Sequence, residues 1–101
     1  MPLVLDTNSV TLILPASNAW IKFFSGSSRR LIIVCSEISG QSFAFGNQDT
    51  GVGGPAIAII NADVGQQITY RDFGPIVQRD IFARALGIAL TVTLTEIFYV
   101  G

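Results

Sequence analysis

Alternation of apolar and polar residues with a period of two is the feature that most limits how this chain can fold. It is clearest in residues 88–95, where four aliphatic side chains alternate with Ala89 and three threonines. In an extended strand these two sets point to opposite faces. Elsewhere, short apolar runs rich in Val, Ile and Phe are interrupted by Gly, Asn, Ser or Pro roughly every eight to twelve positions. The pattern predicts an all-β fold of about seven to nine short strands.

The other expected strands are less regular. They cover residues 10–14, 19–24, 31–38, 43–45, 56–60 and 67–73. Residues 46–55 contain four glycines, Asn47, Asp49 and Pro55 and are predicted to form a long loop. Residues 61–65 and Gly74-Pro75 read as turns, while residues 76–86 fit one or two helical turns or a strand across a corner. With 101 residues there is room for one core, so we expect a single domain, residues 1–101.

Strands of this number and length favour a two-sheet sandwich of the jelly-roll or Greek-key type, with a small closed barrel as the alternative. The last strand carries an irregularity. At Glu96 the alternation breaks, because Ile97 and Tyr99 continue on the threonine side. This predicts a β-bulge near Thr95 and Glu96, or a second buried surface in contact with another chain.

The composition removes most catalytic chemistry. The chain has no histidine and one cysteine, which excludes histidine-based acid–base catalysis, histidine metal sites and an internal disulfide. Cys35 lies in an apolar run with no histidine to activate it, so we interpret it as a core residue. The sequence therefore predicts no catalytic residues, no cofactor, no metal site and no enzymatic activity.

Two loop motifs resemble ligand sites only superficially. The glycines of residues 51–54 lack the Lys-Ser/Thr ending and the following helix of a phosphate loop. The oxygen-bearing side chains of Asn47, Asp49 and Asp63 match no calcium-loop spacing and are interpreted as turn residues.

Charge and hydropathy exclude further partners. The formal net charge is −1 and no basic stripe is present, so nucleic-acid binding is not expected. Arg29 and Arg30 are interpreted as a solvated turn, with partner docking as the alternative. The longest purely apolar runs are about five residues, too short for a membrane helix, and no signal peptide is legible. These features predict cytoplasmic synthesis and no membrane association.

The surface is short of polar groups, because 50% of the residues are hydrophobic and only 13% are charged. Exposed apolar patches usually mark interfaces, so we expect a homo-oligomer or a lattice-bound subunit. Three arginines between residues 70 and 84 could dock an acidic partner; the alternative is a charged edge that blocks strand addition. The predicted interface residues are Arg71, Arg79 and Arg84 on the polar side and Ile97, Phe98, Tyr99 and Val100 on the apolar side.

About the last third of the chain resembles a known class of proteins. Residues 70–75 (YRDFGP), 81–85 (IFARA) and 91–99 (TVTLTEIFY), with Gly87, are similar to small β-rich virion proteins of tailed bacteriophages, some of which are decoration or cement proteins. The resemblance implies a non-catalytic subunit, often trimeric, on the outer surface of the virion head. There it would bind the major capsid protein lattice and stabilise the shell.

Two other functions remain open at this stage. A tail, head-completion or fibre component would share the same composition. A carbohydrate-binding sandwich, from a different class, would use Trp20, Tyr70 or Tyr99 as exposed stacking platforms beside Asn and Asp side chains.

Overall fold

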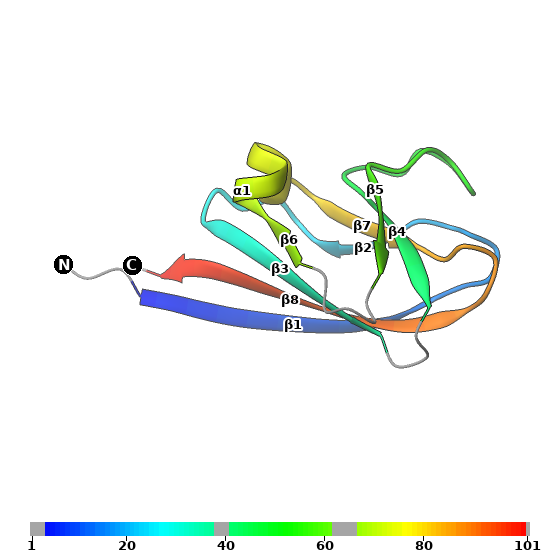
Figure 1. Ribbon diagram of the computed structural model, residues 1–101, viewed down its shortest axis with the longest axis horizontal. Coiled ribbons are helices and arrows are strands. Elements are labelled where there is room, and N and C mark those ends of the chain that lie inside the picture. Colours follow the sequence, from blue (N-terminus) through cyan, green and yellow to red (C-terminus); the bar gives the residue numbers. More distant parts are fainter. Residues whose placement is uncertain (1–3, 38–40, 62–66, 101) are drawn as a thin grey trace.

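The computed structural model describes residues 4–37, 41–61 and 67–100, and within them the chain forms two four-stranded antiparallel sheets (Figure 1). The strands are β1 (Val4–Leu14), β2 (Ile21–Phe24), β3 (Arg30–Glu37), β4 (Ser42–Gly46), β5 (Ala58–Asn61), β6 (Gln67–Thr69), β7 (Ile81–Arg84) and β8 (Leu90–Val100). Between β6 and β7 lie one turn of helix, α1 (Tyr70–Phe73), and a 3-10 helix, η2 (Gly74–Gln78).

The pairing of strands follows one rule. The first sheet has the order β1-β8-β3-β6 and the second β2-β7-β4-β5. The first strand thus pairs with the last, the second with the seventh, the third with the sixth and the fourth with the fifth. A chain that doubles back on itself and winds up in this way is a jelly roll. The structure confirms the predicted all-β two-sheet sandwich.

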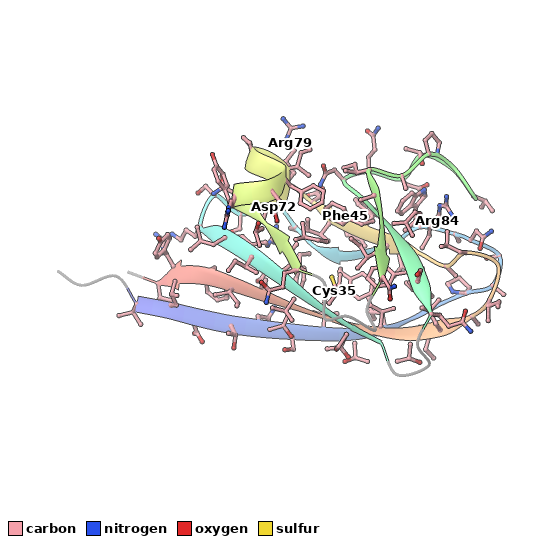
Figure 2. All side chains as sticks on the ribbon, viewed as in Figure 1. Cys35, Phe45, Asp72, Arg79 and Arg84 are labelled. Carbon is pink, nitrogen blue, oxygen red and sulfur yellow. The ribbon has the colours of Figure 1, made fainter. Side chains whose placement is uncertain are left out.

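The core lies between the two sheets and is almost entirely aliphatic and aromatic. Figure 2 shows Cys35 of the first sheet and Phe45 of the second pointing into it. The 3-10 helix adds Val77, which is fully buried, and the ring of Phe73 packs edge-on against Phe45 with centroids 5.9 Å apart. The remaining buried members are Leu14, Phe23, Phe24, Ile33, Phe43, Ile60, Ile68, Ile81, Ala83, Ala85, Leu90, Val92 and Leu94.

Several predicted boundaries change. Strand β1 begins at Val4 rather than residue 10, because pairing with β8 extends through a polar stretch that has no apolar pattern. The strand expected over residues 67–73 ends at Thr69, whose hydroxyl accepts a hydrogen bond from the backbone N–H of Asp72 and caps α1. Residues 46–55 contain no strand beyond Gly46, as expected. Most of the predicted turn at 61–65 lies outside the described residues.

Of the two alternatives for the end of the last strand, a bulge near Thr95 and Glu96 or a surface that contacts another chain, the bulge is wrong. The β1–β8 register runs without a shift from Val4 opposite Val100 to Leu14 opposite Leu90. The irregularity lies instead in β3, between Arg30 and Ile32. The alternation of β8 is unbroken, because Glu96 points inward and pairs with a buried arginine. A polar residue on the core-facing side makes this regular strand look irregular in the sequence.

Burial gives the one thiol a testable property. Desolvation raises the pKa of Cys35 to about 12, because a thiolate has no partner in this core. We expect Cys35 in the folded protein to react with a thiol reagent at pH 8 far more slowly than the same chain in denaturant, which is checked by the two labelling rates. Comparable rates would contradict the burial of this side chain.

Candidate interaction surfaces

Among the residues that the structure describes, Arg30 is the only charged residue that is buried, and its guanidinium makes the main polar contacts of the core. Its side chain is 1% exposed. Nε donates to Glu96 Oε2 at 2.8 Å, and Nη2 donates to the carbonyl of Ser25 at 2.6 Å. Nη1 donates to the carbonyls of Val77 and Arg79, at 3.0 and 2.8 Å. One guanidinium therefore joins β8, the loop after β2 and the end of η2.

This arrangement corrects the interpretation of Arg29 and Arg30 as a solvated turn. Arg29 is exposed as expected, but Arg30 points into the sandwich and its guanidinium lies 5.2 Å from the centroid of the Phe24 ring. Arg29 lies in the turn before β3, whereas Arg30 is the first residue of the strand. Glu96 continues the core-facing set of the last strand and needs a basic partner, but the sequence does not say which arginine supplies it.

Removing the Arg30 guanidinium should destabilise the fold strongly. We expect Arg30→Met to lower the free energy of unfolding by about 3 to 5 kcal/mol, because it leaves a partly buried carboxylate and three carbonyls without their donor. Urea unfolding followed by fluorescence measures the change. Arg29→Met is the matched control and should stay within about 0.5 kcal/mol of the wild type. Equal effects of the two substitutions would contradict the role of Arg30.

Arg84, predicted to dock a partner, holds the glycine-rich loop. Nε and Nη2 both donate to the carbonyl of Gly54, at 3.1 and 2.9 Å, and Nη1 donates to that of Ala85 at 3.1 Å. Its guanidinium also lies over the ring of Trp20, 5.2 Å from the centroid. The Trp20 indole N–H in turn donates to Thr50 Oγ1 at 2.9 Å. These contacts tie residues 50–54 to β7 and leave Arg84 little freedom to bind another molecule.

A cleft of about 500 Å³ separates this loop from η2, and Arg79 stands on its rim. Figure 2 shows the Arg79 side chain pointing away from the sandwich, well apart from Arg84. The floor is fixed by Asn47, whose side-chain N–H groups donate to the carbonyls of Ile76 and Asp80. The cleft is lined by both apolar and polar residues, among them Ile57 and Thr50.

Arg71 borders a second, more open cleft on the other side of α1. Its neighbours there include Tyr70, Asp72 and Ile32, and the Tyr70 ring is 44% exposed. The structure therefore separates the three predicted arginines: Arg71, within α1, and Arg79, at the end of η2, line different clefts, whereas Arg84 holds the glycine-rich loop. Trp20, proposed as a stacking platform, is buried under Arg84 and is not exposed.

Asp80 fastens the loop after β2. Oδ1 accepts the backbone N–H of Gly26 at 2.7 Å, and Oδ2 lies 3.4 Å from Lys22 Nζ. The backbone hydrogen bond, followed by the nearby Lys22 charge, lowers the pKa of Asp80 below its ordinary 3.8. A carboxyl whose pKa falls on folding stabilises the native state above its unfolded pKa, and this contribution disappears as the pH drops through the folded value.

The consequence is a pH-dependent effect of one substitution. We expect Asp80→Asn to lower the melting temperature at pH 7, and the gap from the wild type to narrow as the pH falls below about 3.8, where wild-type Asp80 also loses its charge. Thermal unfolding at several pH values measures it. Asp72→Asn, which removes the same charge from an exposed site, should change the melting temperature less at pH 7. A gap that is constant with pH would contradict the assignment.

The four predicted apolar interface residues lie at the end of β8 beside the start of β1. Ile97 and Tyr99 share the outer, threonine-bearing face of the first sheet, while Phe98 and Val100 point to the inner side. Figure 1 shows β1 and β8 running past the second sheet at the end that carries both termini. None of the four is fully buried, and Val100 is exposed. This end therefore offers one exposed aliphatic side chain, Val100, and three apolar side chains that the described part of the fold covers only in part.

The outer edge of the first sheet is also apolar. Leu5 and Ile13, both on β1, are 55% and 69% exposed. Between them the outward face of β1 carries hydroxyls that bond across to β8: Ser9 to Thr95 at 2.7 Å and Thr11 to Thr93 at 2.8 Å. Sequence analysis missed this half of the surface, because the first ten residues have no regular alternation.

Other kinds of site find little support in residues 4–37, 41–61 and 67–100. This part of the chain brings together no group of three or more Cys, Asp or Glu side chains able to hold a metal ion. Its helices are all too short to cross a membrane. No protein-family model matches the chain, and no curated protein is significantly similar to it.

Proposed function

We propose that the chain is a non-enzymatic structural protein of a phage virion, a decoration or cement protein. It binds the major capsid protein lattice on the outer surface of the head, after synthesis in the host cytoplasm. The observation that carries the proposal is the exposed apolar side chains along β1 and at the end of β8, namely Val4, Leu5, Ile13 and Val100. The resemblance of the last third of the sequence supports the same assignment.

The disposition of the basic groups supports docking rather than catalysis. Of the six basic side chains, Lys22, Arg30 and Arg84 are bonded to groups within the protein. Arg71, within α1, and Arg79, at the end of η2, are exposed and lie on neighbouring elements of the chain, and we assign the contact with an acidic partner surface to these two. The proposal therefore assigns the polar side of the contact to Arg71 and Arg79, and it gives Arg84 a structural role.

The fold adds support by analogy. Jelly rolls recur in viral capsid proteins and also in lectins, so the topology agrees with a virion role without requiring one. Many weak contacts repeated over a symmetric lattice give strong overall attachment even when each is modest. A small sandwich with exposed apolar side chains along β1 suits that mode of binding.

The test is co-sedimentation of the chain with empty phage heads assembled from a major capsid protein. We expect binding to assembled heads and little binding to free capsid protein. The double substitution Arg71→Glu/Arg79→Glu should weaken binding at least about tenfold, since close like charges at an interface cost several kcal/mol. Val52→Glu/Ile59→Glu, which adds two negative charges at exposed sites outside both clefts and outside β1 and β8, should leave it unchanged.

Failure of the wild-type chain to sediment with heads would overturn the decoration proposal. A location on the tail, a head-completion complex or a fibre would then be the alternative, and negative-stain microscopy of particles carrying a label on the chain distinguishes these places. Full binding by Arg71→Glu/Arg79→Glu would instead remove the two arginines from the interface.

A carbohydrate-binding module is the second candidate, and one observation favours it. Tyr70 presents an exposed ring in an open cleft beside Gln67, Arg71 and Asp72, which is the combination of stacking surface and polar groups that sugars use. A glycan array tests it: binding that is lost in Tyr70→Ala would support this function, and an array without hits would exclude it.

A further inference from the structure

Strand β1 is a free sheet edge of unusual length. It pairs with β8 on one side over eleven residues, and no other strand of the described chain pairs with its opposite side. Natural edges are normally protected by shortness, proline, bulges or several charges. Residues 4–14 contain no proline and no bulge, and Asp6 is their one charged residue.

The direction of the free backbone groups follows from the neighbouring strand. The N–H of Tyr99 donates to the carbonyl of Arg29, and the carbonyl of Thr93 accepts from the Ser36 side chain. The odd-numbered residues of β8 therefore direct their backbone N–H and C=O groups toward β3. Their partners in β1 are odd-numbered as well. In an antiparallel pair, a residue that does not bond to its partner strand directs both backbone groups the other way.

Residues Leu5, Thr7, Ser9, Thr11 and Ile13 therefore present their N–H and C=O groups to the open edge. Thr7 provides an independent check, because its N–H donates to the Asp6 carboxylate at 2.7 Å rather than to β8. A single side chain covers one of these donors. The rest of the edge is available to an added strand.

The outward-facing residues of this edge form a palindrome. Reading from Leu5 to Ile13, the side chains on the outer face are aliphatic, Thr, Ser, Thr and aliphatic. If two β1 strands run antiparallel with Ser9 opposite the partner's Ser9, Leu5 lies opposite the partner's Ile13 and Thr7 opposite the partner's Thr11. All of these are hydrogen-bonded positions, so this register uses the whole edge and forms about ten backbone hydrogen bonds. Shifting it by one pair in either direction shortens the ladder, places one of the two aliphatic side chains opposite a threonine and leaves the other without a partner in residues 4–14.

The other edges of the fold are poor partners for β1. Strand β6 has three residues, and β2 and β5 have four each. Within the described chain, only β1 itself has an edge long enough to match eleven residues. A self-complementary pattern on such an edge is the property that a two-fold interface between identical subunits requires.

We propose that two copies of this chain pair through β1 across a two-fold axis at Ser9, joining their first sheets into one continuous sheet. Each Leu5 then packs beside the partner's Ile13, and each Thr7 N–H passes from Asp6 to the partner's Thr11 carbonyl. The dimer does not depend on the proposed capsid function. It differs from the trimer that the sequence resemblance implies, so the two are separated by mass.

Charge placed at opposed positions tests both the surface and the register. In the proposed dimer, residue 5 of each copy lies opposite residue 13 of the other, which gives two such pairs. Leu5→Lys/Ile13→Lys makes both pairs Lys–Lys, whereas Leu5→Glu/Ile13→Lys makes both pairs Glu–Lys. Light scattering after size exclusion should give two chains for the wild type, one for the first variant and two for the second. Val52→Lys/Ile59→Lys is the matched control, because it adds the same charge at sites that are 73% and 52% exposed, and it should remain dimeric.

Circular dichroism and thermal unfolding show that each variant is folded, which the exposure of all four sites leads us to expect. A wild-type chain that is monomeric over about a hundredfold concentration range would overturn the proposal, as would a trimer. A dimer that survives Leu5→Lys/Ile13→Lys would place the interface elsewhere, and a monomeric Leu5→Glu/Ile13→Lys variant would exclude this register. Head binding is measured separately, so a monomer that still sediments with heads would leave the proposed function intact.

Discussion

The buried guanidinium of Arg30 is the interaction on which the arrangement of this sandwich depends. Hydrophobic packing holds the two sheets together but is not directional, whereas four hydrogen bonds from one planar group fix the positions of the elements they reach. They connect Glu96 of β8 to the Ser25 loop and to the end of η2. Burying a charge is costly, and here the cost is offset because each donor nitrogen of the guanidinium has a partner. Loss of this group would free three segments at once.

Other polar side chains hold loops to the sandwich by fewer hydrogen bonds of the same kind. Asn47 holds η2 and the start of β7, Asp80 holds the loop after β2, and Arg84 with Trp20 holds the glycine-rich loop. Gly54 in that loop lies so close to Thr50 that a side chain would collide with its backbone. Several of the few charged side chains in this protein thus bond to groups within the fold. Its surface is correspondingly poor in charge, which leaves exposed aliphatic residues along β1 and β8 without cover.

Sequence patterns determined a large part of the fold and little of the surface. The period-two alternation and the turn residues were enough for an all-β, two-sheet sandwich, with the long loop at residues 46–55 correctly placed. The alternation failed where a polar residue faces the core, at Glu96, and where both faces of a strand are exposed, in the first half of β1. In both places the residue type no longer reports the direction of the side chain.

What only the tertiary structure decided is which distant groups meet. Arg29 and Arg30 are identical in sequence terms, and only the pairing of β3 with β8 makes one solvent-exposed and the other a buried partner of Glu96, 66 residues away. Likewise, Arg71, Arg79 and Arg84 lie close in sequence but on separate parts of the surface. The physical reason is that side-chain periodicity is a local property of the backbone. Strand order, edges and ion pairs are set by contacts between segments far apart along the chain.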